Sequence, residues 1–207
     1  MDDIPDNHPL RLAFVTSATD HHDLPPTRAE VAVVGRSNVG KSSLLNAVAG
    51  QRGLARTSKT PGRTQLLNLF AVDDGDNDLQ PSSAGTVVDC PGYGYAKSSR
   101  ADRNRWQDMV DRYLLDRDGL VMTLVLVDGA VGPTALDVEM LDWLRDSGIP
   151  FTVVATKHDK VKSSKRTRRR RDLAAGCGVD ERAVVWTSAD RNVNVGMLRG
   201  LVRAWLT

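Results

Sequence analysis

The sequence has only two cysteines, Cys90 and Cys177, among its 207 residues. They lack metal-ligand spacing and are too few for a disulfide framework, so we expect both thiols to be reduced. Long apolar runs are missing as well. The longest, 120–127 and 151–156, are far below the roughly 18 residues that a membrane span needs. We therefore expect a protein that does not enter a membrane.

The first ten residues, MDDIPDNHPL, lack the basic and apolar segments of a signal peptide, which favours a cytoplasmic protein. We interpret residues 1–10 as a loose tail. With 41% hydrophobic and 26% charged residues and no internal repeat or linker, the rest of the chain is within the range of one globular domain. Residues 11–207 are therefore predicted to form a single domain.

The net charge of +2 hides an uneven distribution of charge. Acidic residues collect in the first 30 positions and at 73–83, whereas Lys160 to Arg171 contains eight basic residues and no acidic one. We call this segment, KVKSSKRTRRRR, the basic run and expect it on the helix that follows residues 156–159. It indicates an anionic partner, although a solvated helix face is the simpler alternative.

Apolar runs alternate with amphipathic segments, which is typical of βα units around a mostly parallel sheet. The segment 73–83 is too short for a helical crossover, so the strands on either side of it should form an antiparallel hairpin. The predicted fold class is α/β, with a mostly parallel six-stranded sheet, one antiparallel edge strand and helices on both faces. The six strands are expected at about 30–35, 64–72, 84–89, 120–128, 150–156 and 183–187.

Two segments, 101–116 and 198–205, repeat apolar residues at helical spacing, so each should pack one face on the sheet. We expect their aromatic residues to belong to the core. The apolar positions are Trp106, Met109, Val110, Tyr113 and Leu114 in the first segment and Leu198, Leu201, Val202 and Trp205 in the second.

The stretch GRSNVGKS at 35–42 follows a predicted strand and precedes a predicted helix. It fits GxxxxGK[ST], in which main-chain N–H groups and the positive end of a helix surround phosphate oxygens. Lys41 would neutralise the β- and γ-phosphates, and the Ser42 hydroxyl would bind Mg²⁺. The predicted phosphate-binding residues are Gly35, Arg36, Ser37, Asn38, Val39, Gly40, Lys41 and Ser42.

A second motif, VVDCPG at 87–92, ends an apolar strand with an acidic residue. Asp89 would hold Mg²⁺ directly or through water, and the N–H of Gly92 would meet the γ-phosphate. An aspartate that ends a strand is also an ordinary turn former. The prediction therefore depends on the phosphate loop that precedes it.

The tetrapeptide TKHD at 156–159 follows the fifth predicted strand. The Asp159 carboxylate would accept hydrogen bonds from N1–H and N2–H₂ of guanine, a donor pair that adenine lacks. The stem of Lys157 would cover the ring, and N–H groups near Ser188 and Ala189 would meet the guanine carbonyl. The alternative for Asp159 is a helix N-cap.

These motifs, in this order, are those of GTPases with a Ras-like fold, and longer segments resemble one family. The chain is similar to the EngB family, also called YihA or YsxC, within the TrmE-Era-EngA-EngB-Septin-like superfamily. The resemblance spans roughly residues 12–205, and TPGRTQ and PGYGYAK are its most specific parts. The similar segments are FVTSA at 14–18, LPP at 24–26, TSKTPGRTQLLN at 57–68, DCPGYGYAK at 89–97 and DWLRDSGIPF at 142–151.

The resemblance implies a Ras-like P-loop GTPase domain that binds GTP and GDP with Mg²⁺. It also implies a monomer that acts in large ribosomal subunit assembly and is needed for normal cell division and septation. The partners would be large-subunit precursors and ribosomal RNA, for which the basic run would supply charge.

By motif position, the resemblance also implies roles for particular residues. Ser42, Thr64 and Asp89 would hold Mg²⁺. Gly62 to Leu66 would form the first switch, Asp89 to Gly92 would respond to the γ-phosphate, and two loops would hold the base. The residues concerned are Gly62, Arg63, Thr64, Gln65, Leu66, Asp89, Cys90, Pro91, Gly92, Thr156, Lys157, His158, Asp159, Thr187, Ser188 and Ala189.

For the hydrolysis of GTP, the sequence contains few candidate catalytic residues. The residue after Gly92 is Tyr93, where Ras-type enzymes supply a glutamine that positions water. A phenol lacks the acceptor and donor pair of an amide, so we expect slow intrinsic turnover. Asn38 would help to hold K⁺ against the phosphates, as in related GTPases, or would simply tolerate a strained backbone. The candidate catalytic residues are Lys41, Thr64, Gly92 and Asn38.

Slow turnover keeps a second function open, an RNA-binding assembly factor that holds GTP and barely hydrolyses it. A P-loop kinase or ATPase is a third alternative, but it would not need TKHD.

Two positions depart from the family pattern. Cys90 replaces an expected aliphatic or threonine residue and is interpreted as packing, and no arginine follows Asp128 in VDGAVGP at 127–133.

Overall fold

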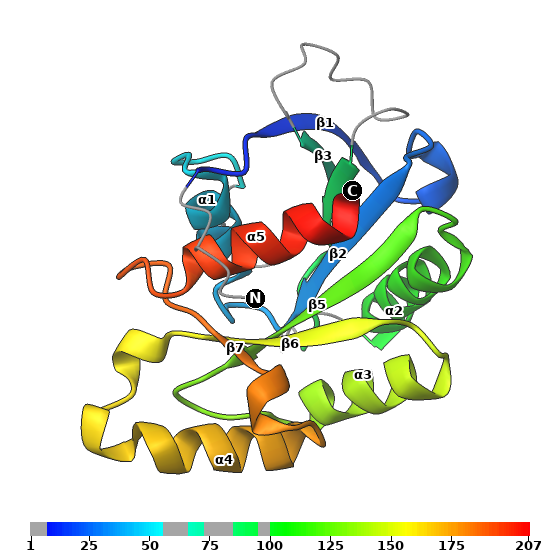
Figure 1. Cartoon of the computed structure of the whole chain (residues 1–207). Helices are drawn as coiled ribbons and strands as arrows, with labels where there is room; N and C mark the ends of the chain where they lie inside the picture. The colour runs from blue at the N-terminus through cyan, green and yellow to red at the C-terminus, as the bar shows by residue number, and fades with distance from the viewer. Residues whose placement is uncertain (1–7, 56–65, 73–84, 95–99) are drawn as a thin grey trace.

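The structure is a computed structural model that describes residues 8–55, 66–72, 85–94 and 100–207, without the side chains of 100–106 (Figure 1). A sheet forms its centre, with strands β1 Leu12–Ala18, β2 Ala29–Gly35, β3 Leu67–Val72, β4 Gly85–Asp89, β5 Leu120–Asp128, β6 Phe151–Thr156 and β7 Val185–Trp186. The α-helices are α1 Lys41–Ala49, α2 Arg100–Asp116, α3 Ala135–Asp146, α4 Arg166–Cys177 and α5 Val195–Leu206. Short 3-10 helices are η1 His21–Asp23, η2 His158–Lys160, η3 Ser163–Lys165 and η4 Glu181–Ala183.

The sheet has the strand order β1-β3-β4-β2-β5-β6-β7. Strands β4, β2, β5, β6 and β7 pair in parallel, whereas β3 is antiparallel to both β1 and β4. The α/β class, the mostly parallel sheet and the β3–β4 hairpin are confirmed. The predicted count of six strands is wrong, because β1 is a seventh strand, and it covers β3, so the antiparallel strand is not at the edge.

The sequence of β1 explains why this strand was not predicted. Its residues, LAFVTSA, mix small, polar and apolar side chains, and its central positions are only half-buried or exposed. Phe14 is 56% exposed, and the pairing register with β3 shifts between Phe14 and Thr16. An irregular edge strand of this kind gives neither a continuous apolar run nor a clean alternation.

Side-chain alternation along the central strand β2 divides the core into two layers. Val31 and Val33 face the layer that contains α1 and α5, whereas Ala32 and Val34 face the layer that contains α2, α3 and α4. Figure 1 shows these two groups of helices on opposite faces of the sheet. Helices on both faces are thus confirmed, and every residue of β2 is buried.

The two predicted amphipathic helices are present as α2 and α5. Val110, Tyr113 and Leu114 of α2 are buried in one layer, and Leu198 and Val202 of α5 are buried in the other. The side chain of Trp106 lies outside the described residues.

The described part of the expected tail, residues 8–10, is packed against two helices. Leu10 is fully buried, and its N–H donates to the Val48 carbonyl at 3.0 Å. The Arg203 guanidinium donates to the Pro9 carbonyl at 2.9 Å. Among the described residues, none of the helices combines the length and the apolar character needed to cross a lipid bilayer.

A buried acid lies at the amino-terminal end of β2. Glu30, which is fully buried, accepts hydrogen bonds from Tyr113 Oη at 2.9 Å and Thr86 Oγ1 at 2.9 Å. Its two carboxylate oxygens also accept from Arg117 Nε and Nη2, at 3.0 and 3.1 Å. A buried carboxylate needs such compensation, so this cluster fixes α2 to the sheet. We call these four residues the Glu30 cluster.

Candidate functional site

The predicted motifs meet at one edge of the sheet. Because β2, β4, β5, β6 and β7 are parallel, their carboxyl ends lie together, and ligands of open α/β sheets bind at that edge. One motif follows each of four strands: residues 35–42 at the end of β2, 89–92 at the end of β4, 156–159 at the end of β6 and 187–189 after β7.

The phosphate loop leads directly into α1, which begins at Lys41. Within the described part of the chain, this helix start has no side-chain hydrogen-bond cap, and its first turn contains no acidic residue. The first N–H groups of a helix have no partner inside the helix and carry its positive end. This helix start thus has the features that anion binding requires, and the binding of phosphate there stays a prediction.

The Lys41 ammonium contacts the Asp89 carboxylate across this loop. Both side chains are largely buried, at 11% and 10% exposed, so each charge depends on the other for compensation. Phosphate oxygens would compensate Lys41, and a divalent cation would compensate Asp89. With the Ser42 hydroxyl at the helix start, this donor set fits a phosphate chain with bound Mg²⁺.

The segment after Asp89 packs on the phosphate loop through its main chain. Tyr93 N–H donates to the Gly35 carbonyl at 3.2 Å, and Ser37 N–H donates to the Tyr93 carbonyl at 2.9 Å. A Cβ atom at Gly92 would lie 2.9 Å from the Ser37 nitrogen, closer than real Cβ atoms approach. Glycine is therefore required at position 92 for this approach.

Cys90 belongs to the interior. It is fully buried, and its N–H donates to the Val33 carbonyl at 3.1 Å. Burial raises the pKa of its thiol far above the usual range, so the thiol stays protonated. The interpretation of Cys90 as a packing residue is confirmed, because its side chain belongs to the core layer that contains α2, α3 and α4.

The segment 156–159 is tied to the phosphate loop by two side chains. Thr156 Oγ1 donates to the Val39 carbonyl at 2.6 Å. Lys157 Nζ donates to the Asn38 carbonyl at 2.9 Å and to Asp128 Oδ2 at 2.7 Å. The loop expected to hold the base is thus fixed relative to the loop expected to hold the phosphates.

Asp128, which ends β5 and pairs with Lys157, lies at this edge but is not among the residues predicted from the sequence. Burial opposes its ionisation, but the hydrogen bond from Lys157 and those from the N–H groups of Val131 and Ala130 outweigh burial. The pKa of Asp128 therefore lies below its usual value. Its position after an apolar strand, like that of Asp89, was the available signal.

The Asp159 carboxylate is held at the same edge. Ser188 Oγ donates to Asp159 Oδ1 at 2.6 Å, and Lys160 Nζ lies 3.3 Å from Oδ2. The hydrogen bond from Ser188 is the main reason that the pKa of Asp159 is lowered. The alternative in which Asp159 caps a helix is wrong, because η2 begins at His158 with Lys157 at its N-cap position. An ionised, oriented acceptor results.

The other residues of the two base loops have more varied surroundings. The Thr187 carbonyl accepts a hydrogen bond from His158 N–H at 3.0 Å. The centroid of the His158 ring lies 6.0 Å from that of the Trp186 ring, so the His158 side chain lies in the interior. Ser188 N–H donates to the Val193 carbonyl at 3.1 Å. Ser188 and Ala189 were the two residues whose N–H groups were expected to meet a guanine carbonyl. The N–H of Ser188 is already bonded to Val193, so of these two only the N–H of Ala189 is outside that hydrogen bond.

The first switch lies mostly outside the described residues, including the predicted Mg²⁺ ligand Thr64. Of this segment only Leu66, which is half-buried, is described. The predicted residues without a described position are Gly62, Arg63, Thr64 and Gln65.

Two hypotheses about hydrolysis depend on Asn38 and Tyr93. Asn38 is exposed and adopts a left-handed backbone with φ of 63°, which asparagine tolerates better than most residues. The Tyr93 side chain is turned into the protein, where it is 5% exposed. Burial raises the pKa of its phenol far above the usual range. Tyr93 therefore does not take the place of a water-positioning glutamine.

Comparison with known proteins agrees with this geometry. A family model described as 50S ribosome-binding GTPase matches residues 30–157. The probable GTP-binding protein EngB of Pelotomaculum thermopropionicum is 48% identical over 156 residues, which cover 75% of this chain and 74% of the relative. That of Streptococcus agalactiae is 41% identical over 187 residues, covering 89% and 84%.

Among solved structures, the crystal structure of a probable GTP-binding protein engB has a TM-score of 0.67 to this chain. Its sequence is 24% identical, and the match covers 85% of this chain and 100% of that one. The likeness shows the fold, and the curated relatives show the family.

The Asp128–Lys157 pair predicts a pH-dependent contribution to stability. Because the pKa of Asp128 is lowered from 3.8, the contribution is present above that value and is lost as the pH falls through the folded-state pKa. Asp128→Asn should lower the free energy of unfolding at pH 7 by roughly 1–3 kcal/mol. The difference from the parent protein should shrink at pH 3, as urea denaturation would measure.

A matched control is Asp142→Asn, because Asp142 pairs with Arg145 at 2.6 Å on the surface. Exposed pairs contribute little, so this variant should resemble the parent protein at both pH values. A deficit of Asp128→Asn that is as large at pH 3 as at pH 7 would contradict the assignment.

Proposed function

The chain belongs to the EngB family of GTP-binding proteins, and on this premise we propose that it acts as a Mg²⁺-dependent GTPase switch in assembly of the large ribosomal subunit. The same role would be needed for normal cell division and septation. One observation carries the proposal: the start of α1, the buried Lys41–Asp89 pair and the Asp159 carboxylate lie at one sheet edge. Residues 11–207 would form one G domain, acting as a cytoplasmic monomer.

In this proposal the nucleotide replaces the Lys41–Asp89 contact. Lys41 and the start of α1 would bind the β- and γ-phosphates, and the N–H of Gly92 would contact the γ-phosphate. Ser42, Asp89 and Thr64 would hold Mg²⁺. When bound, Mg²⁺ supplies neutralisation of the charge that develops on the phosphates.

The chain offers few groups of its own for the hydrolytic step. Tyr93 is directed into the interior, so neither its phenol nor an amide is available to orient water there. We propose that a ribosomal partner supplies the missing element, with K⁺ held by Asn38 as a contributor. The alternative, an RNA-binding factor that barely hydrolyses GTP, is favoured by the same buried tyrosine.

The basic run differs from the expectation that it lies on a helix. It begins in η2, passes through η3 and enters α4 only at Arg166. Three of its arginines contact other residues of the protein. Arg166 donates to the Val161 carbonyl at 3.2 Å, and Arg169 donates to the Val131 carbonyl at 3.2 Å. The Arg170 guanidinium lies 6.0 Å from the centroid of the Trp186 ring.

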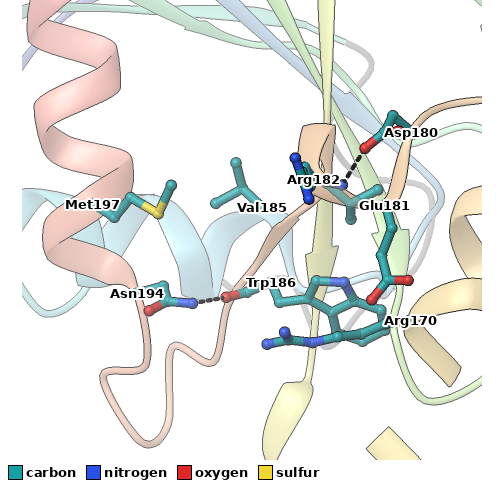
Figure 2. A pocket seen from close by; sticks show the side chains of 9 residues that line it. Arg170, Asp180, Glu181, Arg182, Val185, Trp186, Asn194 and Met197 are labelled. Carbon is teal, nitrogen blue, oxygen red and sulfur yellow. Dashed lines mark hydrogen bonds between the residues drawn. The ribbon is translucent and has the colours of Figure 1, made fainter. Parts of the chain in front are cut away.

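Figure 2 shows Arg170 beside Trp186 in a pocket of about 680 Å³, which residues of α4, η4, β7 and α5 line. The pocket also contains Arg182 and Met197, so its wall mixes charged and apolar groups. It adjoins the basic run through Arg170.

The rest of the run supports an RNA-binding surface. Lys162, Lys165, Arg168 and Arg171 are exposed, and Arg168 and Arg171 are three positions apart on α4, which makes them neighbours. Arg168 lies 3.5 Å from Asp172, an exposed pair of low strength that phosphate would replace. The family description as a 50S ribosome-binding GTPase supports ribosomal RNA as the anion.

Base selection tests the nucleotide site. The parent protein should prefer GTP over ATP by about 10⁴-fold, because adenine lacks the donor pair that Asp159 accepts. Asp159→Asn should instead prefer xanthosine triphosphate, since an amide NH₂ can donate to the C2 carbonyl of xanthine. Competition binding with the three nucleotides measures this. Equal affinity for ATP and GTP would favour the ATPase or kinase alternative.

Turnover tests the switch against its alternative. Single-turnover GTP hydrolysis should be slow for the protein alone and faster by about 10³ to 10⁵ with large-subunit precursor particles, the range that an added catalytic element supplies. The same assay in KCl and NaCl tests Asn38, and equal rates would remove the role of K⁺. Hydrolysis rates that are the same with and without the particles would favour the alternative, an RNA-binding factor that barely hydrolyses GTP.

The RNA surface predicts a salt effect. Binding to large-subunit ribosomal RNA should weaken with salt, and the double variant Arg168→Ala with Arg171→Ala should reduce the slope of log K against log salt by roughly 1.4 to 1.8. A matched control replaces Arg11 and Arg52, which are also exposed, by alanine. Equal effects of the two double variants would contradict a surface centred on α4.

A further inference from the structure

Asp137, in the first turn of α3, is a fully buried carboxylate that the proposed function does not use. Its Oδ2 accepts hydrogen bonds from the Thr134 N–H and hydroxyl, both at 2.8 Å. Its Oδ1 accepts from Tyr93 Oη at 2.8 Å, and Arg36 Nε lies 3.1 Å from Oδ2 as an ion pair. We call Arg36, Tyr93, Thr134 and Asp137 the Asp137 cluster.

Two members of the cluster come from the nucleotide site. Arg36 is the second residue of the phosphate loop, and Tyr93 directly follows Gly92, the proposed γ-phosphate contact. Their main chains form a parallel bridge, so side chains and main chain connect the same two segments. Asp137 thus joins both segments to α3 through buried polar contacts, which are costly to break singly.

The glycines on either side of Tyr93 explain how this arrangement is possible. Gly92 approaches the Ser37 main chain too closely for a Cβ atom. Gly94 has φ of 73°, and a Cβ atom there would lie 2.9 Å from Leu136 Cδ1 on α3. The segment Gly-Tyr-Gly therefore fits between the phosphate loop and α3, with the Tyr93 side chain fixed on Asp137.

We propose that Asp137 is a positioning residue for the γ-phosphate contact, because through Tyr93 and Arg36 it fixes the main chain from which the Gly92 N–H is presented. This inference rests on the proposed function. A GTP-bound protein needs Gly92 at a defined distance from the third phosphate, whereas GDP makes no such demand. The Asp137 cluster therefore contributes to binding GTP and not to binding GDP.

The Glu30 cluster provides a control with the same chemistry. There, too, a tyrosine hydroxyl, an arginine and a threonine surround a fully buried carboxylate, and Tyr113 Oη lies 2.9 Å from Glu30. Glu30 is near the start of β2 and Arg36 follows its end, so the two clusters are separated by roughly 20 Å of extended strand. Loss of either tyrosine hydroxyl removes one hydrogen bond from a buried carboxylate.

The test compares Tyr93→Phe with Tyr113→Phe. Both variants should lower Tm by similar amounts, because each leaves a buried carboxylate with one partner fewer. Only Tyr93→Phe should weaken binding of a non-hydrolysable GTP analogue, by about fivefold or more, the lower range of measured couplings. Its affinity for GDP should be unchanged. Calorimetric titration of both nucleotides into the parent protein and the two variants gives the dissociation constants.

A second variant, Asp137→Asn, removes the charge that pairs with Arg36. It should also weaken binding of the analogue and leave the affinity for GDP unchanged. It keeps the inference testable if Tyr93→Phe does not fold. The inference would be overturned if neither variant lost affinity for the analogue. It would also be overturned if Tyr113→Phe lost as much affinity as they do. A parent protein that binds neither GDP nor the analogue would instead overturn the proposed function.

Discussion

The contact between Lys41 and Asp89 is the interaction on which the site depends. It places two opposite charges, each about nine-tenths buried, where the carboxyl ends of β2 and β4 meet. The parallel register that pairs Val33 with Asp89 brings the carboxylate to the phosphate loop. Since buried charges require compensation, the proposed exchange replaces one internal partner of each charge by a phosphate chain and a cation.

The phosphate loop connects the rest of the site. Its carbonyl oxygens at Asn38 and Val39 accept hydrogen bonds from Lys157 and Thr156 of the base loop. On its other side, Ser37 N–H donates to the Tyr93 carbonyl. One short loop thus contacts both the segment expected to hold the base and the segment that would meet the γ-phosphate.

The sequence predicted those parts whose physical pattern is local. Continuous apolar runs located the central strands, and the phosphate loop was identified because its glycines and lysine follow a strand. It missed β1, whose mixed residues lie at an edge. It also missed the internal contacts of Arg169 and Arg170, because their partners Val131 and Trp186 are far away in the sequence. Asp137 was also missed, since an acidic residue at the third position of a helix usually faces solvent. Asp128 was missed because its partner Lys157 comes from the end of another strand. Only the tertiary structure shows that both are buried.

In the proposed function, this edge binds a nucleotide through its phosphates as well as its base. Calorimetric titration of the protein with GMP and GDP tests it most directly, because the two ligands share a base and differ by one phosphate. We expect GDP to bind about a hundredfold or more tighter than GMP, since the β-phosphate brings charge-assisted hydrogen bonds from Lys41 and the α1 amino terminus. Equal affinities for GMP and GDP would contradict it.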